Sequence, residues 1–374
     1  MSVRARIPLA RPLTGEEELA EIREVLESGH LSQGPKTGEF EGMVAQVAGT
    51  TFALATSSCT TALHLSLVAL GVGPGDEVLV PDFTFPATAN VVIQCGARPV
   101  LVDIDLATYN VDPDELTKHL TSRTRAVIPV HLFGLAAEMD AVTAFAREHG
   151  LRVIEDAACA LGASYRGRPC GSFGEVGCFS FHARKVVTTG EGGMVVTSRP
   201  ELVERLQVLR SHGGVRRDER FLFGEAGFNY RLSDIHAAVG VAQMRRLGDI
   251  VARRRALAAR YRSALDGMAG ITPPSEPEGS SHVYQAFVAL LDPGIDRDAV
   301  VAGMRAHAVE TTIGTYALHD QPFFRRDYGY TGAELPRSHR AFLGTLALPL
   351  YPAMDEGDVD AVVRSLEQVL ATVS

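Results

Sequence analysis

Strand-like apolar runs alternate with helical stretches through the first half of the chain. The runs cover residues 78–81, 99–103, 126–130 and 153–156, and a helical stretch such as 141–148 lies between neighbouring runs. Strands joined by helices pair in parallel, and the helices then cover the faces of the sheet. The pattern therefore predicts a mainly parallel sheet in a three-layer α/β/α arrangement.

Other signals place the ends of this pattern. Thr14 with Glu17 predicts a capping box ahead of a helix that Gly29 ends. Beyond about Gln243 an Arg-rich helical stretch covers 245–262. The simplest interpretation is that its charged side chains face solvent. Arginines near a dimer interface could also contact a substrate phosphate. The length of 374 residues suffices for one large domain and a smaller one.

We expect two domains from these signals. Residues 1–245 are expected to form the large α/β domain with an N-terminal arm. Residues 246–374 are expected to form a smaller α+β domain, whose last helix carries apolar residues at helical spacing over 359–370.

Composition excludes several classes of protein. The net charge of −9 argues against a nucleic-acid-binding surface. No apolar stretch reaches membrane-spanning length, and the basic N-terminus lacks the apolar region of a signal peptide. The five cysteines are odd in number and no pair has metal-ligand spacing. We expect a cytoplasmic enzyme with no metal, no membrane contact and no nucleic-acid partner.

A lysine beside a glycine-rich turn follows an apolar, strand-like run at 176–181. Lys185 stands in the segment 180–193, whose three glycines let backbone approach a ligand closely. The spacing does not fit a P-loop, because the lysine precedes the glycines. A lysine amine can form a Schiff base with an aldehyde cofactor. For a single lysine, a surface position beside a turn is the commoner case.

Asp156 ends another strand-like run. Ligands gather at the carboxyl ends of strands in open parallel sheets, and a carboxylate there can hold a pyridine nitrogen protonated. The apolar residues 157–161 follow, so Asp156 could equally be a helix N-cap.

A third element is a possible anion site. Residues 52–56 read as a strand, and the hydroxyl-rich segment 57–61 then opens an apolar helix. Free backbone N–H groups at a helix start bind anions. Ordinary N-capping by Ser58 or Thr60 is the simpler reading in isolation. An anion site, a strand-end carboxylate and a lysine in one chain are together harder to attribute to chance.

The chain resembles the nucleotide-sugar aminotransferases of the DegT–StrS group, which are pyridoxal 5′-phosphate (PLP) enzymes of fold type I. The group's most specific segment, Ser-Phe-His-x-x-Lys-x-x-Thr-Thr-Gly-Glu-Gly-Gly, is intact at 180–193. The resemblance runs nearly end to end, and its other segments lie at 29–35, 84–90, 102–105, 131–134, 227–235 and 348–352.

The resemblance implies roles for the candidate residues. Lys185 carries the cofactor as a Schiff base and later moves a proton, and Asp156 pairs with the pyridinium nitrogen. Phe85 stacks on the cofactor ring. Asn229 reaches the phosphate of the neighbouring subunit's cofactor, which implies a homodimer with shared active sites. From the sequence alone, Phe85 indicates core packing and Asn229 a polar loop residue.

The remaining roles concern the phosphate and the ring oxygen. By the resemblance, Cys59, Thr60 and Ser180 line the phosphate. The group usually has Gly at the position of Cys59 and Gln or His at that of Cys159, which commonly bonds the cofactor's phenolic oxygen. A thiol is a weak donor, so the protonation of the ring would differ. The residue type favours small buried packing for both cysteines over a catalytic thiol.

The resemblance implies an aminotransferase that moves an amino group from glutamate or glutamine to a keto-sugar nucleotide, with pyridoxamine phosphate as the intermediate cofactor form. Arg216 and Arg217 could clamp the nucleotide diphosphate, or they could be solvated loop charges. Related sugar dehydratases have His in place of the lysine, so Lys185 argues against that reaction. A keto-cyclitol or another antibiotic precursor as substrate stays open, as does a non-catalytic regulator that binds PLP.

Overall fold

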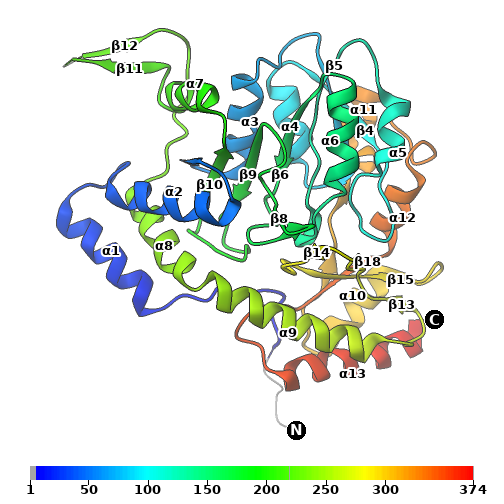
Figure 1. Ribbon diagram of the computed structural model, residues 1–374. Helices are drawn as coiled ribbons and strands as arrows, with labels where there is room; N and C mark the ends of the chain where they lie inside the picture. The colour runs from blue at the N-terminus through cyan, green and yellow to red at the C-terminus, as the bar shows by residue number, and fades with distance from the viewer. Residues whose placement is uncertain (1–5, 219, 374) are drawn as a thin grey trace.

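The main feature of the computed structural model, which describes residues 6–218 and 220–373, is a seven-stranded sheet (Figure 1). Its strand order is β1-β10-β9-β6-β5-β2-β4, and all neighbours are parallel except β10, which is antiparallel to β1 and β9. The expected mainly parallel sheet is confirmed. The strands are β1 Phe52–Thr56, β2 Glu77–Pro81, β4 Arg98–Val102, β5 Thr124–Val127, β6 Arg152–Asp156, β9 Val176–Ser180 and β10 Gly193–Thr197.

Helices cover both faces of this sheet. On one face, Phe40 of α2, Val142 of α6 and Val241 of α8 join one apolar core, and on the other, residues of α3, α4 and α7 join a second core. The three-layer α/β/α arrangement is therefore confirmed. The helices are α1 Glu16–Ser28, α2 Pro35–Ala48, α3 Cys59–Ala69, α4 Ala87–Gln94, α5 Pro113–Leu116, α6 Met139–Glu148, α7 Pro200–Arg210 and α8 Asp234–Arg245.

A second, antiparallel sheet lies in the C-terminal part of the chain, with strand order β13-β15-β18-β16. It packs with α9, α10 and α13 around a third core. Its strands are β13 Ile271–Thr272, β15 Phe287–Leu291, β16 Thr312–Ile313 and β18 Thr345–Leu348. The helices of this part are α9 Leu247–Leu265, α10 Arg297–Ala306, α11 Pro322–Tyr328, α12 Pro336–Gly344 and α13 Glu356–Val373.

Short elements connect the two parts. In one, β17 pairs with β3, which follows β2 in the chain, and in another β14 pairs with β7. These elements are β3 Phe83–Thr84, β7 Ser164–Tyr165, β8 Arg168–Pro169, β14 Ser280–Ser281 and β17 Tyr316–Ala317, with the 3₁₀ turns η1 Thr117–His119, η2 Leu132–Gly134 and η3 Leu318–Asp320. The expected domain boundary at 245/246 falls between α8 and α9, and the division there stays a prediction.

One arginine of the Arg-rich stretch is not on a solvated face. Arg254 on α9 is 3% exposed and donates to the carbonyl oxygens of Tyr284 at 3.1 Å and Leu350 at 3.2 Å. Burial lowers the pKa of Arg254 to about 10. This guanidinium ties α9 to the loops that precede β15 and follow β18.

The predicted capping box at the first helix is wrong by one residue. The helix begins at Glu16, and the N–H of Gly15 donates to Glu18 Oε2 at 2.7 Å. Glu18 is buried, since it also accepts from the amide of Gln243 at 2.7 Å and pairs with Arg246. Gln243 and Arg246 determine that Glu18 is the glutamate that turns inward. The spacing of the capping-box motif does not indicate these distant partners.

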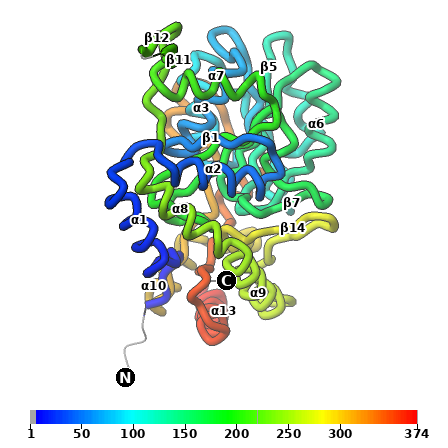
Figure 2. The backbone as a smooth tube through the Cα atoms, turned by 60° about the vertical axis from the view of Figure 1, so that its left-hand side comes forward, coloured from blue at the N-terminus to red at the C-terminus, as the bar shows by residue number. Residues whose placement is uncertain are grey.

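A β-hairpin projects beyond α7 at the top of the molecule (Figures 1 and 2). It consists of β11 Gly214–Arg217 and β12 Arg220–Phe223. Its apolar side chains Val215, Phe221, Leu222 and Phe223 are exposed. Among the described residues, none of the helices combines the length and the apolar character that crossing a membrane requires.

Candidate active site

Asp156 is a buried carboxylate at the carboxyl end of β6. The hydroxyl of Thr88 donates to Oδ2 at 2.8 Å, and the N–H of Ala158 donates to Oδ1 at 3.1 Å. Burial raises the pKa of Asp156, and these hydrogen bonds only partly offset the effect. None of the described residues forms a salt bridge with Asp156. A cationic group brought by a ligand would therefore stabilise its ionised form.

The residues after Asp156 settle one alternative. Residues 157–161 form turns instead of a helix, so Asp156 is not a helix N-cap. Its backbone is fixed on both sides. Its N–H donates to Pro129 O at 2.9 Å and its carbonyl accepts from His131 N at 3.0 Å, and on the other side it pairs with Cys178 of β9. The carboxylate is thus held rigidly at the edge of the sheet where ligands gather.

Lys185 lies in the loop between β9 and β10. The chain has three lysines, and the other two are engaged with carboxylates: Lys36 with Glu21 and Glu24, and Lys118 with Glu115. Lys185 Nζ instead lies 3.0 Å from Cys159 Sγ. It is the lysine whose amine is available for a carbonyl cofactor.

The charge state of Lys185 reflects opposing effects. Burial lowers the pKa of its amine, but the neighbouring Cys159, Cys59 and Asp156 outweigh burial, and the pKa is raised overall. Cys159, Cys59 and Asp156 are thus close enough to Lys185 to influence the charge of its amine. Cys159 is partly exposed, so the expectation that it is buried packing is wrong. Cys59 is itself buried, and burial raises the pKa of its thiol well above the usual value.

The N-terminus of α3 forms the third part of the site. Ser58 caps this helix by accepting from Thr61 N at 3.1 Å. The N–H groups of Cys59 and Thr60 have no hydrogen-bond partner among the described residues. As the first N–H groups of a helix, they can bind an anion such as a phosphate.

A close backbone approach brings Ser180 to the same helix end. Gly193 pairs with Ser180 on one side and with Thr56 on the other. A Cβ at Gly193 would lie 2.5 Å from Cys59 N, so only glycine lets β10 pass the start of α3 this closely. Ser180 and the free N–H groups at the start of α3 therefore lie on either side of Gly193.

Phe85 is placed beside the carboxylate and not in the core. Its ring is 63% exposed, and its carbonyl accepts from Thr88 N at 3.2 Å, next to the Thr88–Asp156 contact. The ring of Tyr316 lies 6.4 Å away between centroids. The core-packing interpretation of Phe85 is wrong, and its open face can cover a planar ligand.

Asn229 lies apart from these groups. It is exposed, and its backbone pairs with Ser211, while the carbonyl of the next residue, Tyr230, accepts from Ser57 N at 2.9 Å. The segment therefore runs beside β1 at the edge of the sheet. Among the described residues, the Asn229 side chain forms no hydrogen bond with Lys185 or Asp156 of its own chain.

Sequence reasoning gave no role to Thr88 or Gln285. Thr88 stands three residues after Phe85 in the matching segment 84–90. The sequence therefore contains the hydroxyl but does not indicate that it bonds to Asp156. The amide of Gln285 donates to Arg184 O at 2.5 Å and so anchors the loop of Lys185 to the C-terminal part. No local pattern signals a contact over such a separation.

A buried hydrogen-bond network around Glu155 stabilises the strand that carries Asp156. His131 Nε2 lies 2.9 Å from Glu155 Oε2, and both side chains are fully buried. Glu155 also accepts from the N–H groups of Gly171 at 2.7 Å and Gly174 at 2.8 Å. The network fixes β6 and the segment around His131, and with them Asp156.

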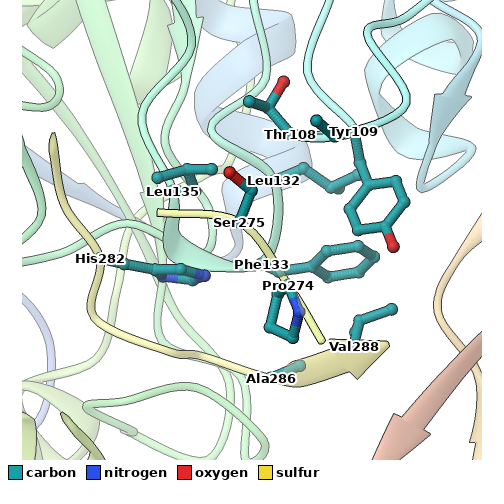
Figure 3. Close-up of a pocket in the computed structure, with 11 residues that line it drawn as sticks. Thr108, Tyr109, Leu132, Phe133, Leu135, Pro274, Ser275, His282, Ala286 and Val288 are labelled. Carbon is teal, nitrogen blue, oxygen red and sulfur yellow. The ribbon is translucent and has the colours of Figure 1, made fainter. Parts of the chain in front are cut away.

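The enclosed cavity in Figure 3 is not part of this site. Its volume of about 10 Å³ suits a single water molecule, and it lies between η2 and the segments 274–275 and 282–288. His282 on its wall has a pKa lowered to about 3 by burial, so the ring is neutral near pH 7. The cavity therefore offers neither room nor an acid for a reaction.

The DegT/DnrJ/EryC1/StrS aminotransferase family matches residues 12–367 of the chain. This chain belongs to that family. It is 38% identical to the aminotransferase TlmJ of Streptoalloteichus hindustanus, with 99% of this chain and 100% of that chain covered and a TM-score of 0.93. It is also 38% identical to the spore coat polysaccharide biosynthesis protein SpsC of Bacillus subtilis, with 97% of each chain covered.

Another similar structure, Spr1654 of Streptococcus pneumoniae, is described as a sugar aminotransferase and is solved with PLP and with pyridoxamine phosphate. The PLP form is 27% identical, covers 99% of this chain and 100% of that chain, and has a TM-score of 0.94. The present chain is a PLP-dependent sugar aminotransferase of fold type I. Its free lysine amine, buried carboxylate, open aromatic face and anion site fit this cofactor.

Replacing Lys185 by Ala is expected to abolish the visible absorbance of the PLP-loaded enzyme, because no other amine can bind the aldehyde there. Borohydride reduction of the wild type followed by peptide mapping should label Lys185. Lys118→Ala serves as the control and should keep the absorbance. Label on Lys36 or Lys118 in the wild type would overturn the assignment.

Asp156→Asn is expected to fold but to lower kcat by about 100-fold, since loss of a buried ion pair costs about 3 kcal/mol. Thr88→Val, which keeps the side-chain shape and removes one hydrogen bond to the carboxylate, should lower kcat by only about tenfold. Steady-state kinetics at saturating PLP measure both effects. Turnover near that of the wild type in Asp156→Asn would contradict the role of this carboxylate.

Proposed function

We propose that the enzyme transfers an amino group from glutamate or glutamine to a keto-sugar nucleotide, in deoxyamino-sugar biosynthesis. The observation that carries the proposal is the environment of Lys185, whose amine contacts Cys159 and interacts electrostatically with the buried Asp156 and with Cys59 at the start of α3. Membership of a sugar aminotransferase family and similarity to a polysaccharide biosynthesis protein support the substrate class.

The residues divide the work of the reaction. When bound, PLP supplies an aldehyde that captures the donor's amine and a protonated pyridine that accepts electrons. Asp156 holds the proton on the pyridine nitrogen. Lys185 Nζ would take the proton from the α-carbon of the donor and return it at the carbon that carried the cofactor's aldehyde. With the keto-sugar, Lys185 Nζ would move a proton in the opposite direction.

The other residues hold the cofactor in place for that proton transfer. We propose that the N–H groups of Cys59 and Thr60 and the hydroxyl of Ser180 bind its phosphate, and that Phe85 covers one face of its ring. Cys159 lies where relatives usually have Gln or His facing the phenolic oxygen. Residues that held the cofactor at its phosphate and at its nitrogen would keep a bound ring in place relative to Lys185 Nζ.

The substrate class is tested with purified enzyme, both amino donors and a panel of nucleoside-diphosphate 4-keto- and 3-keto-sugars. We expect an amino-sugar nucleotide from at least one member, and none with Lys185→Ala. Turnover of a keto-cyclitol and of no sugar nucleotide would replace the substrate class. PLP absorbance with no turnover of any keto compound would favour a non-catalytic regulator.

We further propose a homodimer with shared active sites, located in the cytoplasm. Asn229 is exposed beside β1, and the hairpin before it presents four exposed apolar side chains, as interaction surfaces do. Arg216 and Arg217 stand on this projecting hairpin, where they could reach a partner's diphosphate or remain solvated. All five cysteines are free, as a reducing compartment requires.

Complementation tests the shared site. Lys185→Ala and Asn229→Ala homodimers should each be inactive or strongly impaired, and exchange of subunits should restore part of the activity. The mixed dimer then has one site with both changes and one with neither. If Asn229 acts only within its own chain, every site keeps one defect and exchange restores nothing.

A further inference from the structure

Asp82 and His319 form a buried pair that joins the large sheet to the C-terminal part. Asp82 directly follows β2, and both residues are fully buried. Asp82 Oδ2 lies 2.6 Å from His319 Nδ1, and Oδ1 accepts from the backbone N–H of His319 at 2.7 Å. The carbonyl of Asp82 also accepts from Leu318 N at 2.9 Å. Three hydrogen bonds thus hold two consecutive residues of η3 against the end of one strand.

The imidazole of His319 is held at both of its nitrogens. Its Nε2 lies 3.3 Å from Nδ1 of His339 on α12. Gly332 lies against this contact, since a Cβ there would be 3.1 Å from His339 Nδ1 and 3.4 Å from His319 Nε2. The ring therefore cannot turn away from Asp82 without losing its contact with His339.

The Asp82–His319 pair lies directly beside the short ribbon that β3 and β17 form. Each strand has two residues, and Thr84 is opposite Tyr316. A ribbon of two strands is marginally stable by itself. Asp82 precedes one strand and η3 follows the other, so the hydrogen bonds of the pair continue the pairing of the ribbon. The position of the ribbon therefore depends on the pair.

Phe85 directly follows this ribbon. Its ring lies 6.4 Å from that of Tyr316 between centroids, and both rings are exposed, so packing in a core does not fix them. On the other side the carbonyl of Phe85 accepts from Thr88 N at 3.2 Å, and Thr84 Oγ1 lies 3.1 Å from Thr88 Oγ1. The direction of the Phe85 ring is thus set by the backbone, which the ribbon holds on one side and the start of α4 on the other.

We propose that His319 is a positioning residue, which through Asp82 and the ribbon holds the ring of Phe85 where it can cover a bound cofactor. This inference rests on the role proposed for Phe85. A ring that is already in place does not have to be ordered when a ligand binds, and the ligand then binds more tightly. The proposal makes binding of the cofactor at the large sheet depend on a buried side chain of the C-terminal part.

A neighbouring contact of the same kind provides a control. Asp103 directly follows β4, the neighbour of β2 in the sheet, and the hydroxyl of Ser338 on α12 donates to its Oδ1 at 2.8 Å. Both residues are buried. This contact also joins a strand end to the C-terminal part, but neither residue belongs to the ribbon or adjoins Phe85 in the chain. If His319 only stabilised the fold, the two contacts would have the same effect on cofactor binding.

The test is a double-mutant cycle on the Kd of the full-length protein for pyridoxamine phosphate, measured by equilibrium dialysis. This ligand forms no Schiff base with Lys185, so the cycle reports non-covalent contacts. His319→Ala should raise the Kd about tenfold, because binding must then order a loose ring. Phe85→Ala should also raise the Kd, and adding His319→Ala to it should change the Kd by less than about twofold.

Two further variants separate positioning from stability. His319→Asn keeps an N–H donor near the position of Nδ1 and should restore the affinity of the wild type. Ser338→Ala removes the control contact and should leave the Kd unchanged. An equal loss of affinity in Ser338→Ala and His319→Ala would show a general effect on the fold and would contradict the proposal.

The cycle distinguishes the possible failures. If His319→Ala raised the Kd by the same factor with and without the Phe85 ring, His319 would not act through Phe85 and the inference would be wrong. If Phe85→Ala bound the ligand as tightly as the wild type, the role of Phe85 would fail, and that of His319 with it. Absence of turnover with every keto-sugar would refute the proposed function and leave the result of the cycle unchanged.

His319→Ala leaves the Asp82 carboxylate buried without its partner, which can prevent folding. In that case the double variant Asp82→Asn, His319→Leu removes the side-chain contact and the charge together, and the same changes in Kd are expected.

A fluorescent reporter tests the ring in the cofactor-free protein. The chain has no tryptophan, so Phe85→Trp provides a single fluorophore at this position. Adding His319→Ala to Phe85→Trp should lower the fluorescence anisotropy, because the ring gains freedom to move. Adding Ser338→Ala instead should leave the anisotropy unchanged. The same anisotropy with and without His319→Ala would show that His319 does not hold this position, and the proposal would fail.

Discussion

The two consecutive carboxylates at the end of β6 are the constraint on which the site depends. Neighbouring side chains of a strand point to opposite faces, so Glu155 and Asp156 meet different surroundings. Glu155 is fully satisfied by His131 and by backbone N–H groups, and it fixes the strand. Asp156 has only two neutral hydrogen-bond donors, which leaves a buried carboxylate ready for a cationic ligand. Glu155 thus stabilises the fold, and Asp156 is the carboxylate for which we propose a role in the reaction.

Gly193, at the start of β10, likewise affects both the fold and the site. Because Gly193 has no side chain, β10 can pass within contact of Ser58 and Cys59 while it pairs with β9 and β1. Strand pairing thereby sets the distance between Ser180 and the first N–H groups of α3. An anion held there would be bound by main-chain groups whose positions the sheet determines, and this rigidity is what a cofactor used for proton transfer needs.

Much of this could be predicted from the sequence, because it follows from local patterns. The apolar runs gave the parallel strands, the hydroxyl-rich segment gave the start of α3, and the lysine segment gave the loop after β9. What could not be predicted depends on partners far apart in the chain. The inward turn of Glu18 depends on Gln243 and Arg246, and the burial of Arg254 depends on carbonyls near residues 284 and 350. The contact between Cys159 and Lys185 likewise joins two loops that only the sheet brings together.

The edge strand β1 shows how the proposed dimer must be arranged. Open strand edges invite pairing with other chains, yet the edge of β1 is closed by its own chain. Ala55 donates its N–H to Glu41 at 2.7 Å and offers its carbonyl to Arg210 at 2.8 Å, and these two side chains are themselves ion-paired. Ser57 is bonded to Tyr230 in the same way. A partner therefore cannot extend the sheet at these positions. At this edge it would meet the side chains that this covering segment presents outward, and Asn229 is an exposed residue of that segment.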